Sequence, residues 1–176
     1  MRLGIFGGTF DPPHLGHLIL AAEAFDQLQL DRILWVLTPD PPHKQHQVIS
    51  PLTQRLTLVK AAISGNAAFE LSLVDINRRP PYYAADTLRL LDAENPCAEL
   101  FYLLGGDSLH NLPFWHAPEV LVATCDGLGV MRRPGDQINL DQLEMILPEA
   151  VRKVRFIDSP LLEISSKQIR ERIAEN

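Results

Sequence analysis

The stretch that decides the fold is Gly4-Ile5-Phe6-Gly7-Gly8-Thr9-Phe10-Asp11-Pro12-Pro13-His14-Leu15-Gly16-His17. The apolar residues Leu3–Phe6 predict a short buried strand, and Leu15–Leu28 predict the helix that follows it. Between them, Gly7 and Gly8 are expected to form a turn that needs backbone freedom and close approach. The free N–H groups of such a turn, together with the positive end of the next helix, bind anions. The opening stretch therefore predicts a phosphate-binding turn between a strand and a helix.

Two histidines stand at the expected start of this helix. His14 and His17 are three residues apart, so they share one face of its first turn. Gly16 is costly inside a helix, which indicates that another group approaches the backbone there. A His-x-x-His pair on its own also occurs on plain surfaces and in metal sites. Zinc is disfavoured here because no third Cys, Asp or Glu lies nearby at a suitable spacing, and imidazoles directed at a polyphosphate fit better.

The composition is that of a globular protein. With 176 residues, 46% of them hydrophobic and 22% charged, we expect residues 1–176 to form a single domain. The net charge of −6 argues against nucleic acid or an anionic membrane as a partner. Cys97 and Cys125 are isolated, which favours reduced, structural cysteines. No leader opens the chain and no apolar run reaches the ~18–20 residues of a membrane span, so a cytoplasmic protein is expected.

Apolar runs alternate with helical patterns along the chain. This order predicts an α/β, Rossmann-like fold, with a mostly parallel sheet and helices on both of its faces. Strands are predicted at Leu3–Phe6, Arg32–Leu37, Phe69–Leu73, Leu100–Leu104, part of Leu121–Val130, and Val154–Ile157. Helices are predicted at Leu15–Leu28, Leu52–Ser64, Ala84–Ala93, Ser108–Asn111 and Ser166–Ala174.

Three predicted connections fall at the carboxyl ends of strands, where open parallel sheets bind ligands. They are the Gly7-Gly8 turn, the loop Thr38–Ser50 and a second glycine turn at Gly105-Gly106. The loop contains Pro41-Pro42-His43-Lys44, a stiff approach to a cationic side chain, although a loop lysine is more often simply solvated. We expect a site assembled from these distant parts of the chain.

The opening stretch resembles the T/HxGH signature of the nucleotidyltransferase superfamily. Its longer form, residues 7–17, resembles the bacterial nicotinate-nucleotide adenylyltransferase family. The resemblance implies a Rossmann-like nucleotidyltransferase fold, with His14 and His17 contacting the triphosphate of ATP. It also implies that Lys44, in a similar Pro-Pro-His-Lys, places a positive charge on a phosphate.

Residues 78–88 resemble the family's Arg-x-x-Pro-Ser-Tyr-Thr-x-Asp-Thr-Leu, with Tyr82 in place of Ser and Ala84 in place of Thr. In the family this turn holds the nicotinate ring, and its backbone N–H groups meet the carboxylate. The resemblance therefore implies acceptor binding by Tyr83, Ala84 and Thr87. Without it, the same residues would be read as an aromatic pair closing over a helix start.

Further motifs follow in family order. Gly105 and Asp107 match a Gly-x-Asp that contacts the nucleotide ribose, where the plain reading is a turn with a helix cap. Trp115 matches a tryptophan that stacks on the nicotinate ring, where the plain reading is a buried core residue. Arg133 belongs to an Arg-Pro-Gly that could reach phosphate or adenine, where the plain reading is a surface turn.

Residues 164–170 resemble the superfamily's Ile-Ser-Ser-Thr-x-Ile-Arg, with Lys167 in place of Thr. Ser165 or Ser166 can cap the expected last helix, whose start would also face the triphosphate. Arg170 lies one turn further along and can reach the same ligand. The expected catalytic residues are His14, His17, Lys44 and Arg170. The expected ATP-binding residues are Gly7, Gly8, Thr9, Phe10, Gly16, Gly105, Asp107, Arg133, Ser165 and Ser166.

The resemblance implies transfer of AMP from ATP to nicotinate mononucleotide, which yields deamido-NAD and pyrophosphate. The protein would supply positioning and positive charge, with Mg²⁺ carried on the triphosphate and no metal site of its own. One alternative keeps the fold but takes another acceptor, such as nicotinamide mononucleotide or phosphopantetheine. A second alternative is a nucleotide-binding protein without turnover, which the departures at Tyr82 and Ala84 would favour. The sequence leaves the oligomeric state open, a homo-oligomer included.

Overall fold

The computed structural model describes residues 1–42, 47–132, 138–160 and 162–175. Within these residues six strands form one sheet in the order β3-β2-β1-β4-β5-β6, and every neighbouring pair is parallel. This is the strand order of doubly wound dinucleotide-binding folds, with a switch point beside β1. The strands are β1 (Arg2–Gly8), β2 (Arg32–Leu37), β3 (Phe69–Ser72), β4 (Glu99–Gly105), β5 (Gly127–Arg132) and β6 (Val154–Asp158).

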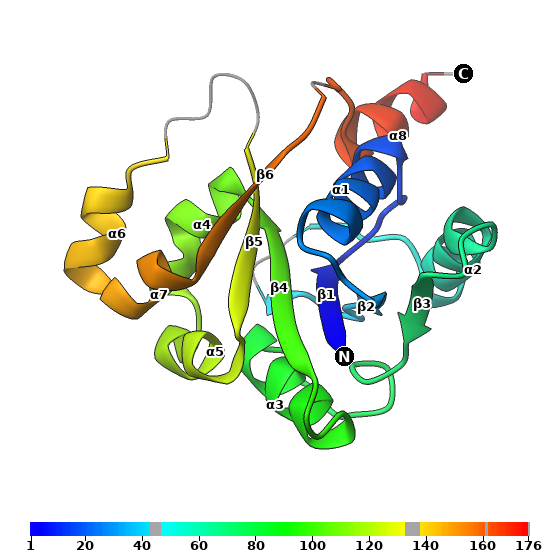
Figure 1. Cartoon of the computed structure of the whole chain (residues 1–176). Coiled ribbons are helices and arrows are strands. Elements are labelled where there is room, and N and C mark those ends of the chain that lie inside the picture. The colour runs from blue at the N-terminus through cyan, green and yellow to red at the C-terminus, as the bar shows by residue number, and fades with distance from the viewer. Residues whose placement is uncertain (43–46, 133–137, 161, 176) are drawn as a thin grey trace.

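Helices lie on both faces of the sheet, as predicted (Figure 1). Figure 1 shows α1 (Leu15–Gln27), α2 (Leu52–Ile63) and α8 (Ser166–Ala174) on one side. The other side carries α3 (Ala84–Glu94), α4 (Gly106–Asn111), the 3₁₀ turn η2 (Leu112–Phe114), α5 (Pro118–Thr124), α6 (Leu140–Ile146) and α7 (Pro148–Lys153).

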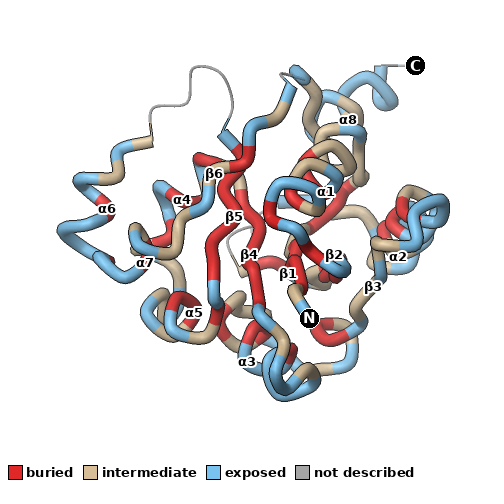
Figure 2. Tube along the Cα trace, in the orientation of Figure 1, coloured by how far each residue is buried: buried red, intermediate tan, exposed pale blue. Residues whose placement is uncertain are grey.

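The central strands are buried on both faces because their side chains alternate between two cores. In β2, Leu34 packs with α3, α4 and α5, whereas its neighbours Ile33 and Trp35 pack with α1 and α2. Figure 2 shows the buried residues concentrated along β1, β4 and β5. The near-continuous apolar runs that predicted these strands are therefore explained by burial on two sides.

The prediction of glycine turns was wrong at both positions. Gly7 and Gly8 belong to β1 and pair with Val36 and Leu37 of β2. They are needed for space: a Cβ on Gly8 would lie 2.8 Å from the Phe10 ring, and one on Gly7 would lie 3.2 Å from the Tyr102 hydroxyl. The connection to α1 is instead the loop 9–14, in which Phe10 has a φ of 46°.

The second predicted glycine turn does not form because the strand runs directly into a helix. Gly105 is the last residue of β4, and Gly106 is the first residue of α4. Asp107 consequently lies in the first turn of a helix at the carboxyl edge of the sheet.

The apolar run Leu121–Val130 was predicted as strand in part, and only its end is. Residues up to Thr124 form α5, which begins at Pro118, a residue suited to the first turn of a helix. Its side chains Leu121 and Val122 pack in the core that α3 shares. Helices α6 and α7 were not predicted. Asn139 caps α6 by accepting a hydrogen bond from the Gln142 N–H at 3.0 Å, and Pro148 opens α7.

In the part of the chain that the structure describes, no helix combines the length and apolar character needed to span a bilayer.

Candidate active site

A cavity of about 700 Å³ opens at the carboxyl ends of β1, β2 and β4. This volume lies within the ~300–1,000 Å³ typical of small-molecule sites. Residues from the predicted ATP-binding and acceptor-binding sets both line it. The lining residues are Ile5, Gly7, Gly8, Thr9, Val36, Thr38, Pro41, Pro42, Asp75, Tyr82, Tyr83, Ala84, Thr87, Tyr102, Asp107, Ser108, Asn111, Phe114, Trp115 and His116.

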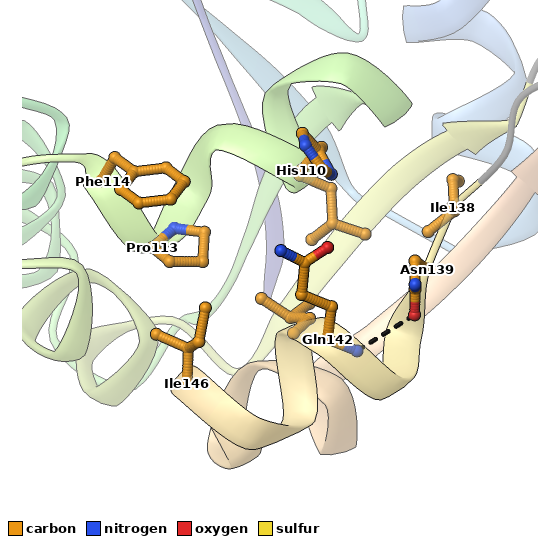
Figure 3. A pocket seen from close by; sticks show the side chains of 9 residues that line it. His110, Pro113, Phe114, Ile138, Asn139, Gln142 and Ile146 are labelled. Atoms are coloured by element: carbon orange, nitrogen blue, oxygen red, sulfur yellow. Dashed lines mark hydrogen bonds between the residues drawn. The ribbon is translucent and has the colours of Figure 1, made fainter.

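A second, smaller cleft lies next to it between η2 and α6 (Figure 3). Phe114 lines both hollows, and the cleft is closed from the other side by residues of α6 such as Ile146. Its volume of about 20 Å³ holds roughly one water molecule. The larger cavity is therefore the candidate site for a nucleotide.

The two histidines meet at the start of α1, as their spacing predicted. His14 is the N-cap, and its backbone N–H donates to Nδ1 of His17 at 3.1 Å. The imidazole rings lie 3.7 Å apart between centroids, with an angle of 30° between their planes. Because Nδ1 of His17 accepts a hydrogen bond, the proton of its neutral ring resides on Nε2.

Aromatic side chains of the core pack against the His17 ring. The His17 ring contacts the rings of Phe6 and Phe10, with centroids 5.9 and 5.2 Å away. The Phe10 side chain is only 2% exposed and also packs on Trp35. Phe10 as a whole residue is therefore part of the core, and it leaves almost no surface for a ligand.

Helix α8, which lies at the far end of the sequence, donates two hydrogen bonds to the loop 9–14. The Ser166 hydroxyl donates to the Pro12 carbonyl at 2.8 Å, and Nη1 of Arg170 donates to the Asp11 carbonyl. Ser165 is the N-cap and accepts from the Gln168 N–H, which confirms the predicted cap.

Other groups approach the backbone of Gly16 closely, as the glycine at this helix position predicted. A Cβ at this position would lie 3.1 Å from the His14 ring and 3.4 Å from Cγ2 of Ile164. The start of α1, the loop 9–14 and the start of α8 thus form one compact cluster.

Arg55 holds this cluster to the loop after β2, and sequence reasoning missed it. Its side chain is 1% exposed, and its guanidinium donates to the carbonyls of Thr9, Thr38, Pro39 and Ser50. Burial lowers the pKa of Arg55, and the nearby carboxylates of Asp11 and Asp40 partly offset this. A signal was available, because Arg55 stands four and eight residues before the buried Val59 and Ile63, on the apolar face of α2.

On the acceptor side, aromatic rings form the wall of the cavity. Tyr83 stacks on His116 with centroids 4.0 Å apart and 21° between the planes. The ring of half-buried Trp115 packs edge-to-face with that of Tyr102, with the centroids 6.1 Å apart. Burial, with a smaller contribution from the charge of Asp75, raises the pKa of the Tyr102 phenol. His116 and Tyr102 were not predicted as site residues.

Thr87 lies in the cavity wall, where its hydroxyl is already bonded. It donates to Oδ1 of Asp75 at 2.8 Å and accepts from Nη2 of Arg78 at 3.1 Å. Asp75 is 2% exposed and forms an ion pair of 2.8 Å with Nε of Arg78. Sequence reasoning missed Asp75, which carries no local motif.

The predicted residues fall into three sets. Gly7, Gly8, Thr9, Tyr83, Ala84, Thr87, Asp107 and Trp115 line the cavity. His14, Gly16, His17, Ser165, Ser166 and Arg170 gather around the loop 9–14, while Phe10 is buried below and Gly105 ends β4. Lys44 and Arg133 lie outside the described residues.

Comparison with known proteins agrees with this geometry. The family model described as cytidylyltransferase-like matches residues 5–172. A probable nicotinate-nucleotide adenylyltransferase of Thermomicrobium roseum is 45% identical over 174 residues, which cover 99% of this chain and 81% of that protein. The nicotinate-nucleotide adenylyltransferase of Bacillus subtilis is 39% identical over 171 residues, with 97% and 85% covered.

Among solved structures, the fold matches that of Plasmodium falciparum nicotinic acid mononucleotide adenylyltransferase complexed with NaAD. The TM-score is 0.76 at 19% identity, over 97% of this chain and 82% of the other. The predicted Rossmann-like nucleotidyltransferase fold is thereby confirmed. The chain belongs to the cytidylyltransferase-like family and, within it, to the nicotinate-nucleotide adenylyltransferases.

Proposed function

We propose that this chain transfers AMP from ATP to nicotinate mononucleotide in NAD biosynthesis, releasing pyrophosphate and deamido-NAD. The observation that carries the proposal is the continuity of the 700 Å³ cavity. Gly7, Gly8 and Thr9 line it at the end of β1, whereas Tyr83 and Ala84 line it at the start of α3 and Trp115 lines it just after η2. One cavity thus has room for two substrates whose reacting phosphates must meet.

In this reaction an oxygen of the acceptor's 5′-phosphate attacks the α-phosphorus of ATP. The bond from that phosphorus to the bridging oxygen breaks, and pyrophosphate leaves with its electron pair. Such a transfer needs alignment and positive charge more than a protein nucleophile. The chain's contribution is therefore to hold donors around the phosphates before the reaction begins.

His17 is the best oriented of these donors. Its Nδ1 accepts a hydrogen bond from the His14 N–H, which fixes the ring at the start of α1, and we assign its Nε2–H to the triphosphate. Arg170 uses one N–H on the Asp11 carbonyl and has further donors for a phosphate oxygen. We assign the same electrostatic role to His14 and Lys44, with Ser165, Ser166 and Arg133 as further ATP contacts.

Mg²⁺ would enter with ATP as part of the substrate and neutralise charge on the triphosphate. Within the described ranges, no three His, Cys, Asp or Glu side chains come together as a metal site.

The acceptor's pyridine ring would stack on Trp115, and its carboxylate would meet the N–H groups at the start of α3. Within the described residues, the N-cap Tyr83 makes no side-chain cap there, so these donors remain for a ligand. A backbone contact of this kind survives the replacement of Thr by Ala84. Asp107, exposed at the cavity wall, would accept from ribose hydroxyls.

The test is pyrophosphate release from ATP with nicotinate mononucleotide, nicotinamide mononucleotide and phosphopantetheine in parallel. We expect kcat/KM for the acid to exceed that for the amide by about tenfold or more, because a carboxylate accepts charge-assisted hydrogen bonds. Equal values for acid and amide would refute acid recognition. Tight ATP binding with no pyrophosphate from any acceptor would identify a nucleotide-binding protein without turnover.

His17→Asn tests the assigned donor. The Asn carbonyl oxygen can still accept the His14 N–H, so α1 keeps its start while the imidazole is lost. We expect kcat to fall on the order of a hundredfold at saturating ATP, with circular dichroism unchanged. Undiminished turnover would remove His17 from the mechanism.

A further inference from the structure

A buried polar network lies directly behind the acceptor wall. Asp75 is 2% exposed, and its Oδ1 accepts from Nε of Arg78 and from the Thr87 hydroxyl, both at 2.8 Å. Nη2 of Arg78 donates to the same hydroxyl at 3.1 Å. The three side chains therefore form a closed triangle that joins the turn before residue 78 to the first turn of α3.

The guanidinium of Arg78 also fixes the backbone that leads into α3. Its Nη1 donates to the Pro81 carbonyl at 2.7 Å, and its Nη2 contacts the Tyr83 carbonyl at 3.3 Å. Tyr83 is the N-cap residue of α3, so the Arg78 side chain sets the orientation of this helix start. The planar fork of an arginine can make these bonds together, whereas a lysine cannot.

The charges of the network explain how an acid can be selected without a salt bridge. Arg78 is paired with Asp75 at 2.8 Å, and within the described residues its other hydrogen bonds go to the Thr87 hydroxyl and to the backbone carbonyls of Pro81 and Tyr83. Among the described residues that line the cavity, Asp75 and Thr87 appear and Arg78 does not, so its charge is compensated behind the wall. Recognition of the carboxylate is left to N–H groups whose position must be accurate, since a misplacement of about 1 Å can cost a hundredfold.

We propose that Asp75 and Arg78 are positioning residues for the acceptor. They hold the start of α3 at the place where it reads the nicotinate carboxylate, and Thr87 acts with them through its hydroxyl. This inference rests on the proposed function. It assigns acid selectivity to the geometry of a helix start fixed by a neutral buried pair.

The primary variant is Arg78→Gln, with the exposed neighbour Arg79→Gln as a matched control. We expect KM for nicotinate mononucleotide to rise about tenfold or more in Arg78→Gln and the preference for acid over amide to shrink. KM for ATP should stay within about twofold, because the network contacts the acceptor side alone. Arg79→Gln should match the wild type in both substrates.

Arg78→Gln leaves the Asp75 carboxylate buried without its partner, which is destabilising. The double variant Asp75→Asn with Arg78→Gln removes both charges and recovers much of that stability. We expect its KM for the acceptor to remain high even though its unfolding midpoint rises above that of Arg78→Gln. The recovery of stability without recovery of KM is the signature of a positioning role.

Two results would overturn the inference. One is an unchanged KM for the acceptor in either folded variant, and the other is an equal rise in KM for both substrates. A wild-type protein that releases no pyrophosphate with nicotinate mononucleotide would instead refute the proposed function, so the two failures are distinguishable.

Discussion

Replacing Arg55 by methionine tests how the triphosphate side of the site is held together. The side chain makes four hydrogen bonds of 2.6 to 3.0 Å to the carbonyls of Thr9, Thr38, Pro39 and Ser50. Methionine fills a similar volume but donates to none of them. The variant therefore removes the bonds while keeping most of the packing of α2.

The expected magnitude follows from these four bonds. A hydrogen bond from a charged donor contributes about 1.5–3 kcal/mol, but bonds sharing one side chain do not add. The cost of burying the guanidinium offsets part of the gain. We expect a loss of about 3–5 kcal/mol in the free energy of unfolding, and hence a fall in Tm on the order of 10 °C.

Calorimetry measures the unfolding, and initial rates measure KM for ATP, which should rise because Thr9 carries the start of the loop 9–14. Arg55→Lys is the matched control, since it keeps the charge but cannot reach four carbonyls at once. Its Tm should fall between those of the wild type and Arg55→Met. A loss of less than about 2 °C in Arg55→Met, with KM for ATP unchanged, would contradict this reasoning.

Two further predictions concern Gly16 and the cysteines. Gly16→Ala places a Cβ 3.1 Å from the His14 ring, so kcat/KM for ATP should fall about tenfold. Tm should be kept or raised, because alanine favours the helix. Full activity would show that the close approach of Gly16 does not position His14. Burial raises the pKa of Cys125 to about 11, so at pH 8 its thiolate fraction is roughly one in a thousand. Iodoacetamide at pH 8 should therefore modify the exposed Cys97 alone. Reaction at Cys125 should appear as the pH approaches 11 or when the protein unfolds. Two labels on the folded protein at pH 8, measured by mass spectrometry, would refute the burial of Cys125.

The sequence predicts those elements that carry a local signal of their own. The strand Arg32–Leu37 and the helix Ser166–Ala174 have the predicted bounds, because an apolar run on two buried faces and a serine cap are local signals. The run Leu121–Val130 is different, since the composition of its first part suits either a strand or a helix. Pro118 is a local signal for a helix start, and the packing of Leu121 and Val122 in the core shared with α3, which the sequence does not show, also favours the helix.

The site residues differ in the same way, since some carry a local sequence signal and others are recognised only by their partners in the folded chain. Motif residues such as His14 and His17 could be placed because they share one helix turn. Arg55 reaches Thr9 across 46 residues. The Asp75–Arg78 pair is local, but its role depends on the turn that it supports. Such residues require the folded chain to be recognised.

The contacts of α8 also have a consequence for biosynthesis. Ser166 and Arg170 bind the loop 9–14 across 154 and 159 residues, and every residue of α8, from Ser166 to Ala174, is at least partly exposed. At ~5–20 residues per second, a ribosome delivers α8 roughly 8 to 30 seconds after the loop. A nascent chain can pair its early strands during this time, but its loop 9–14 still lacks the hydrogen bonds from Ser166 and Arg170. With the roles proposed above for Ser166 and Arg170, we expect activity to arise only in this late step. A chain whose translation stops before Ser166 is then expected to fold much of its sheet without activity.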